Sequence, residues 1–311
     1  MEVHQSAFIG SNQMLKGGLH CHTTRSDGKG DPAEVIRLHR AHGYDFLAIT
    51  DHRKYNRTNF APETGLTILP GMEFDNATFE RVNGFRTFHT VCIGPDDETN
   101  PYQQDQTFES ARARDQFEYQ PYLDRLHADG QLTLYCHPEW SSTPARYFEK
   151  QKGNFAMEIW NSGCAMECGI DTNAAYWDEL LGQGIRIFGA ATDDGHAMDQ
   201  HCNGWVMVNA ENRVPAILDA LRQGDFYSSC GPIISDFYIR ENRVCIDTSP
   251  CARVFFRSDR HPARQIKADG ALLTHAETDL NGRWDGDYAY IRAEVVDDQG
   301  RRAWTNPIFL G

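Results

Sequence analysis

The chain has 311 residues with 40% hydrophobic content, enough for one large domain or two unequal ones. Its net charge of −14 argues against a stable nucleic-acid partner, because a surface that follows phosphates needs clustered Lys and Arg. No apolar run reaches the roughly 18 residues that cross a bilayer, and residues 1–11 show no signal-peptide pattern. Nine cysteines without a CxxC pair indicate reduced thiols, so we expect a cytoplasmic protein.

Short apolar strands alternate with helices over the first two thirds of the sequence. Asp31 is a typical N-cap, Pro32 suits the first helical position, and Gly43 is a typical stop, so the pattern predicts a helix between them. The predicted strands are residues 15–22, 46–50, 66–69, 88–93, 132–135, 155–160 and 185–190, and the predicted helices are 31–43, 119–129 and 174–181. Such alternation indicates a parallel sheet.

Polar residues stand at or near the ends of most of these strands. In a parallel barrel this edge is the active face, although an open doubly wound sheet also binds ligands there. No GxGxxG motif follows the first strand, and candidate ligands come from nearly every strand. We therefore predict a seven-stranded, irregular (β/α) barrel.

The pattern changes after Gly224. Gln299-Gly300 separates two apolar runs, which is a hairpin signal. The short predicted strands are residues 233–239, 243–246, 254–256, 288–295 and 303–310. We predict that residues 1–226 form the barrel, and that 227–311 form a small antiparallel β domain, a sandwich.

Six histidines and three carboxylates stand at the predicted strand ends. His20 and His22 lie two apart on one strand, so their side chains point to the same side, about 6.6 Å apart at Cα. Cys21 then points the other way, into the core. Imidazole and carboxylate are ligands of zinc, manganese and iron, and nine of them suffice for two or three ions. The nine are His20, His22, Asp27, His52, Glu73, His89, His137, Asp194 and His196.

These motifs resemble those of the PHP (polymerase and histidinol phosphatase) family over roughly residues 15–225. The residues that carry the resemblance are His20-x-His22, Ser26-Asp27-Gly28, Thr50-Asp51-His52, Gly71-x-Glu73, His89, His137-Pro138 and Asp194-x-His196. The D-x-H spacing selects Asp194 as the metal ligand. Asp193 would then support the ligands from behind without binding the metal. The tail segments 221–227, 231–232 and 303–308 resemble a branch with a C-terminal β domain, which includes carbaryl-hydrolase-like proteins.

The resemblance implies a distorted (β/α)7 barrel with two or three Mn, Fe or Zn ions. By this analogy three groups share the ions. The first group consists of His20, His22, Glu73 and Asp194. In the second, Glu73 bridges to His89 and His137. The third is completed by Asp27, His52 and His196. Paired ions lower the pKa of a shared water, so the family implies attack by a metal-bound hydroxide on a phosphoester.

An anionic small-molecule substrate needs positive charge as well. Arg25 is the leading candidate for binding phosphate and assisting catalysis, with a solvated surface charge as the equal alternative. Lys29 and Arg53 also lie in strand-end loops, but for them the solvated surface charge is the favoured interpretation. His201 is a candidate leaving-group acid, with a core or surface histidine as the alternative. Asn161 either contacts substrate or caps a loop.

Three functions follow from these residues. The leading one is a phosphoesterase acting on a nucleotide or sugar phosphate. A carbamate or amide hydrolase on the same metals is the second, suggested by the tail, and a non-enzymatic binding module is the third. The sequence does not indicate the oligomeric state.

Overall fold

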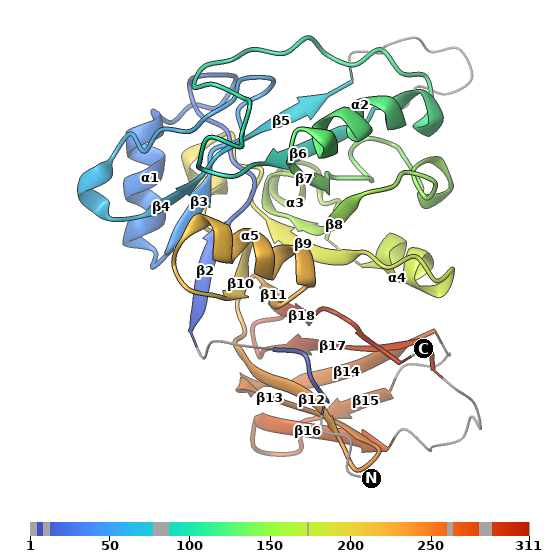
Figure 1. Ribbon diagram of the computed structural model, residues 1–311. Helices are drawn as coiled ribbons and strands as arrows, with labels where there is room; N and C mark the ends of the chain where they lie inside the picture. The colour runs from blue at the N-terminus through green and yellow to red at the C-terminus, as the bar shows by residue number, and fades with distance from the viewer. Residues whose placement is uncertain are drawn as a thin grey trace.

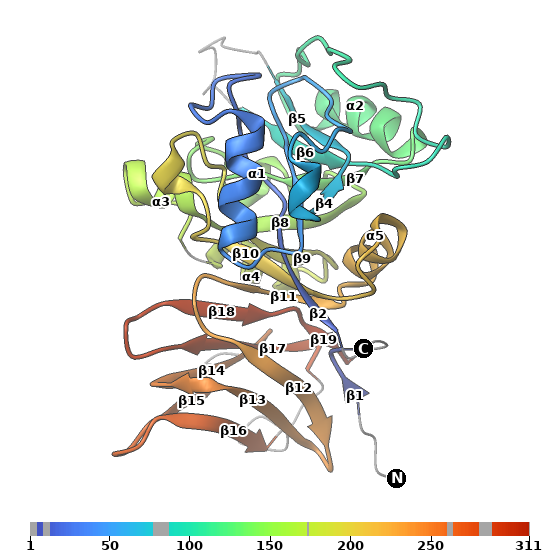
Figure 2. The same cartoon turned by 90° about the vertical axis from the view of Figure 1, so that its left-hand side faces the viewer.

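The computed structural model describes residues 5–8, 13–76, 87–172, 174–259, 264–279 and 288–310. Figures 1 and 2 show all the helices on one side of the molecule and the strands of the C-terminal segment stacked on the other. Over these described ranges, every helix is too short or too polar to span a bilayer.

The described residues between 13 and 229 contain ten strands and five α-helices. The strands are β2 (Met14–Gly18), β3 (Phe46–Ala48), β4 (Thr67–Leu69), β5 (Gly71–Asp75), β6 (His89–Ile93), β7 (Leu132–Tyr135), β8 (Asn154–Asn161), β9 (Phe188–Thr192), β10 (Trp205–Asn209) and β11 (Phe226–Ser229). The helices are α1 (Pro32–Ala41), α2 (Gln116–Ala128), α3 (Ser162–Cys168), α4 (Ala175–Gly182) and α5 (Val214–Gln223).

The three predicted helices are present as α1, α2 and α4. Helix α1 begins where the sequence predicts, because Asp31 and Glu34 form a reciprocal capping box ahead of Pro32. Helices α3 and α5 were not predicted. The sequence does carry a signal for α5, since Pro215 lies in its first turn and Gly224 ends it with a φ of 78°.

The prediction of a parallel sheet is wrong for β6, which runs antiparallel to both β5 and β7. Strand β10 is likewise antiparallel to β2. Parallel pairs join β2 to β3, β3 to β4, β7 to β8 and β8 to β9. The chain therefore has a mixed α/β fold, and His89 reaches the functional edge from the start of its strand rather than the end.

A closed barrel is not confirmed. Strands β2, β3, β4, β10 and β11 belong to one sheet, and β5 to β9 belong to another. Single bridges join the two where the strands end, through Glu73 N to Thr50 O (3.0 Å) and His22 N to Gly195 O (3.0 Å). One apolar cluster nevertheless fills the interior, with side chains from both sheets such as Phe46, Val91 and Ala190.

The C-terminal strands are antiparallel, as predicted. They are β12 (Ile234–Arg240), β13 (Arg243–Cys251), β14 (Arg253–Ser258), β15 (Arg264–Lys267), β16 (Leu273–Asp279), β17 (Tyr290–Val296), β18 (Arg302–Thr305) and β19 (Ile308–Phe309). The hairpin at Gln299-Gly300 is confirmed by the pairing of Val296 with Arg302. The N-terminal β1 (Gln5–Ser6) pairs with β12, so the first residues join the tail's four-stranded sheet.

The boundary at residue 226 remains a prediction. Strand β11 pairs with β10 on one side and with β18 on the other, so one sheet runs from the first part of the chain into the tail. The tail has its own apolar cluster between β12, β13 and β16 on one side and β14 and β17 on the other.

A buried ion pair fastens the tail to α4. Arg292 of β17 is fully buried, and its Nε and Nη2 donate to the two carboxylate oxygens of Asp178 at 2.8 and 2.7 Å. Its guanidinium also lies 4.6 Å from the ring of Trp177.

We expect Asp178→Ala to lower the free energy of unfolding by about 3 kcal/mol, because it leaves a buried guanidinium without its partner. This is the lower end of the usual range, since the Asp178 side chain is itself 32% exposed. Asp219→Ala is the matched control, because that helical carboxylate pairs with the exposed Arg222 and should contribute below about 1 kcal/mol. Urea unfolding measures both, and equal losses would contradict the expectation.

Candidate metal centre

The buried carboxylate of Glu73, in the middle of β5, is the centre of the site. Both of its oxygens face imidazole nitrogens that come from separate segments of the chain. Oε2 lies 3.4 Å from His20, 3.2 Å from His22 and 3.1 Å from His52, and Oε1 lies 2.9 Å from His89 and 3.3 Å from His137. A carboxylate placed in this way can bridge two ions.

The charge of Glu73 is set by these neighbours. Burial alone would raise the pKa of its carboxyl, but the imidazoles of His52, His89 and His20 hold that pKa well below its ordinary value. Glu73 is therefore ionised.

A second buried carboxylate, Asp194, closes the centre from the end of β9. Its Oδ1 lies 3.2 Å from Nε2 of His20 and 3.1 Å from Nε2 of His22, and its Oδ2 lies 3.9 Å from His137. The backbone φ angle is 48° at Asp194 and 25° at His137, and residues other than glycine rarely adopt positive values. Such strained backbone conformations concentrate at functional sites.

The third carboxylate, Asp27, lies at the mouth of the site. It faces Nε2 of His196 at 3.5 Å, Nδ1 of His22 at 3.6 Å and Nε2 of His52 at 3.7 Å. The nearby imidazole of His196 holds the pKa of the Asp27 carboxyl below its usual value.

The structure brings the nine predicted ligands together. Their ligand atoms form overlapping groups within 4.8 Å, made of His20, His22, Glu73 and Asp194, of His22, Asp27, His52 and His196, and of His52, Glu73 and His89. His137 adjoins the last group through Glu73. The atoms His52 Nδ1 and Glu73 Oε2 lie 3.1 Å apart but are not aligned for a hydrogen bond, so two buried polar atoms lack a partner that a divalent ion would provide. The donor set thus fits divalent metal ions.

Four of the imidazoles are oriented from behind. Each has one ring nitrogen on a supporting group while the other faces the cluster, which is typical of metal-binding histidines. The supporting contacts are His20 to Glu158 (2.7 Å), His22 to Ser26 (3.3 Å), His137 to Ser141 (3.1 Å) and His196 to the carbonyl of Asp194 (2.9 Å).

Glu158, on β8, was missed by the sequence analysis. Besides His20, its carboxylate accepts hydrogen bonds from Thr192 Oγ1 at 2.6 Å, from the backbone N–H of His137 at 2.8 Å and from Asn161 Nδ2 at 2.9 Å. Glu158 lies between apolar residues of a strand. An acidic residue in such a buried position was the feature of the sequence that could have indicated a functional role.

The sequence left two alternatives for Asn161, contact with substrate or a capping role. In the structure Asn161 is the N-cap of α3. Its Oδ1 accepts from the N–H of Cys164 at the start of α3, while Nδ2 donates to Glu158 and to Asp194 at 3.0 Å. The side chain is fully buried. Asn161 therefore positions Asp194, and its side-chain groups are already engaged.

The predicted substrate-binding cations lie beside the centre rather than in it. Arg25 donates to Asn56 at 2.7 Å and pairs with Asp105, in a neighbouring loop. Arg53 pairs with Asp75, which also lies 3.3 Å from His52. The backbone N–H of Lys29 donates to the carbonyl of His196. None of these three cations lines the pocket at the centre.

His201 also lies behind the centre. The ring is buried, and burial together with the nearby His39 lowers its pKa to about 4. His201 does not line the pocket, so the structure gives no support for a role as leaving-group acid.

The centre opens into a pocket of about 250 Å³. The indole of Trp140 forms one wall, 4.9 Å from the ring of His137 and 5.6 Å from that of His89. Asp171 fixes this wall by accepting the backbone N–H groups of Glu139 and Trp140 at 2.9 and 2.8 Å. The pocket suits a small substrate with one flat or apolar part.

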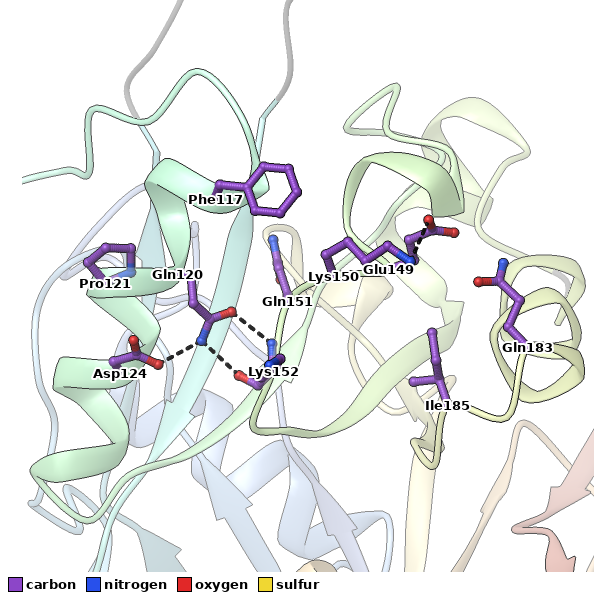
Figure 3. A pocket seen from close by; sticks show the side chains of 10 residues that line it. All are labelled: Phe117, Gln120, Pro121, Asp124, Glu149, Lys150, Gln151, Lys152, Gln183 and Ile185. Carbon is purple, nitrogen blue, oxygen red and sulfur yellow. Dashed lines mark hydrogen bonds and ion pairs between the residues drawn. The ribbon is translucent and has the colours of Figure 1, made fainter.

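A larger cavity, of about 840 Å³, lies apart from the centre beside α2 (Figure 3). There Gln120 links Asp124 to the backbone of Lys152, and Phe117 extends over the opening. Among the described residues its lining contains no histidine or cysteine, whereas the smaller pocket is lined by the clustered histidines.

We expect Glu158→Gln to weaken metal binding by about 10–100-fold, because groups that orient a metal-binding histidine have effects of this size. Equilibrium dialysis with Mn²⁺ measures the affinity. Glu179→Gln, an exposed change on α4, serves as the control and should leave it unaltered. An unchanged affinity in the Glu158 variant would show that His20 does not depend on this contact.

Metal affinity should rise as the pH increases from about 6.5 to 9. Burial opposes protonation of His137, but Glu73 and Asp194 outweigh it and raise its pKa to about 9, so below that pH an ion must displace a proton. The pKa of His22 is raised in the same sense. Titration with Mn²⁺ at several pH values tests this, and an affinity that stays flat would contradict it.

Comparison with protein-family models gives no match, and no curated protein matches either. Among solved structures, the chain is similar to a two-domain protein from Bacteroides vulgatus described as containing a predicted PHP-like metal-dependent phosphoesterase. The TM-score is 0.50 at 15% identity, with 94% of this chain and 95% of that chain covered. An amidohydrolase from Chromobacterium violaceum aligns over 58% of this chain and 88% of its own, at 14% identity and a TM-score of 0.42. The chain thus shares the fold of a two-domain PHP-like protein, in agreement with the resemblance of its motifs.

Proposed function

We propose that the protein is a metal-dependent hydrolase that cleaves the phosphoester of a small metabolite, such as a nucleotide or sugar phosphate. The observation that carries this proposal is the buried Glu73 carboxylate, whose two oxygens face five imidazoles. Two or three divalent ions, of manganese, iron or zinc, would be held by the nine clustered residues.

Bound ions of this kind lower the pKa of water and polarise the oxygens of the scissile group. The protein's residues hold the site in shape for that chemistry. Glu73 joins the groups of ligands, Glu158 fixes the ring of His20, and Trp140 limits the size of the substrate. Among the residues that the structure describes, the pocket's lining has acidic residues and no Lys or Arg, so from this part of the chain the positive charge that attracts an anionic substrate would come from the ions.

The same observation keeps a second function open. Because the described part of the pocket lining contains no Lys or Arg to bind an anion, a neutral carbamate or amide would also fit there. Hydrolysis of such a bond needs the same activated water, so the two functions differ in substrate and not in the centre.

The test is metal analysis of the purified protein combined with assays on phosphomonoesters, phosphodiesters, carbamates and amides with added Mn²⁺. We expect two or three equivalents of metal and release of phosphate, and we expect Asp194→Ala to abolish turnover because it removes a shared carboxylate. Asp199→Ala, an exposed change five residues along, should retain activity.

Phosphate release that persists in the Asp194 variant would contradict the proposed site. Turnover of carbamates or amides alone would select the second function. If the purified protein binds no metal, the third possibility, a non-enzymatic binding module, would be favoured.

A further inference from the structure

A second group of potential metal ligands lies behind the centre, on the other side of the Asp193-Asp194 pair. Asp194 faces His20 and His22, whereas Asp193 faces His39 of α1 and has His201 nearby. The ligand atoms of His39, Asp193 and His201 lie within 4.8 Å of one another. The three side chains are 0%, 2% and 4% exposed.

The imidazoles of this group have buried nitrogens without partners. His39 Nε2 and both ring nitrogens of His201 make no hydrogen bond to any residue that the structure describes. His39 Nδ1 donates to the carbonyl of Val35 at 2.8 Å, which leaves the lone pair of Nε2 directed at the group. Orphaned buried atoms of this kind also mark the centre at Glu73, and in a folded protein each needs an explanation.

Asp193 is held in place with one oxygen still available. Its Oδ1 accepts the backbone N–H groups of Asn203 and Gly204, both at 2.8 Å, and its Oδ2 accepts only that of Cys202, at 2.7 Å. Oδ2 lies 3.7 Å from His39 Nε2. That separation is too long for a hydrogen bond, but ligands about 2.0–2.2 Å from one zinc ion would lie roughly 3.3–3.6 Å apart.

The ring of His201 is fixed by close packing. A Cβ on Gly195 would lie only 2.4 Å from its Nδ1, so glycine is required there for the ring to occupy this position. The ring of His39 packs edge-on against it, with centroids 5.3 Å apart. Both rings are thus held near Asp193 without a hydrogen bond between them.

We propose that His39, Asp193 and His201 bind one zinc ion, separate from the centre at Glu73. Two imidazoles and a carboxylate in a tetrahedral arrangement, with a water in the fourth position, suit zinc. The ion would link α1 to the segment after β9 and so support the backbone that carries Asp194 and His196. This site does not depend on the proposed hydrolase function.

The test measures zinc equivalents in metal-stripped, reloaded and desalted full-length protein. We expect His39→Gln to bind about one equivalent fewer than the wild type. His42→Gln is a matched control, because His42, the C-cap of α1, makes the same contact with the carbonyl four residues back, at 2.9 Å, but is exposed. It should bind as many ions as the wild type. Equal zinc content in the His39 variant and the wild type would overturn the proposal.

A second variant covers the case in which His39→Gln does not fold. The triple variant Asp27→Asn/Glu73→Gln/Asp194→Ala removes a carboxylate from every ligand group of the other centre and leaves this group intact. We expect it to retain one zinc equivalent and to melt at a higher temperature with zinc than after chelation. A triple variant that binds no zinc overturns the proposal. If instead the centre at Glu73 binds no metal, the result would differ. The wild type would then bind one equivalent of zinc, and the His39→Gln variant would bind none.

Discussion

The arrangement of this molecule depends on keeping a carboxylate charged inside the protein. Glu73 is 1% exposed, and an ionised group in such a position is costly unless positive or polar partners surround it. The partners are imidazoles delivered by segments that lie far apart in the sequence. The two sheets meet at the same place, because the backbone of Glu73 itself bridges to the end of β3. The seam between the sheets and the centre of the site are therefore one feature.

Further buried acids hold the loops around this centre. Asp51 accepts the N–H of Thr23 at 2.8 Å and the hydroxyl of Ser26 at 2.8 Å, which fixes the segment that leads to Asp27. Asp171 does the same for the segment with Trp140, and Asp193 for the segment after His196. Buried carboxylates that bind backbone N–H groups thus turn irregular loops into a rigid rim. Part of the chain's acidic excess has this structural purpose.

The tail contributes to the same framework. Strand β11 is hydrogen-bonded to β10 and to β18, and Arg292 of β17 reaches across to Asp178 of α4. Asn306 adds a further contact between the tail and β9, because its amide oxygen accepts the N–H of Gly189 at 3.1 Å. Strand β9 carries Asp194 at its end, so the packing of the tail bears on the position of a proposed ligand.

The sequence by itself determined the residues of the candidate centre and many of the local elements. The capping residues of α1 and the hairpin at Gln299-Gly300 follow from local chemistry and from spacing along the chain. His20 and His22 were predicted on a strand of residues 15–22, but that strand, β2, ends at Gly18 and both histidines lie beyond it. The direction of β6, the division of the strands into two bridged sheets, and the contacts of Glu158 and Asn161 were decided by tertiary structure. Strand direction and contacts between distant residues depend on packing over the whole chain, which local pattern does not encode. Arg25 shows the same limit, since its position in the sequence suggests the site but does not reveal its partners Asn56 and Asp105.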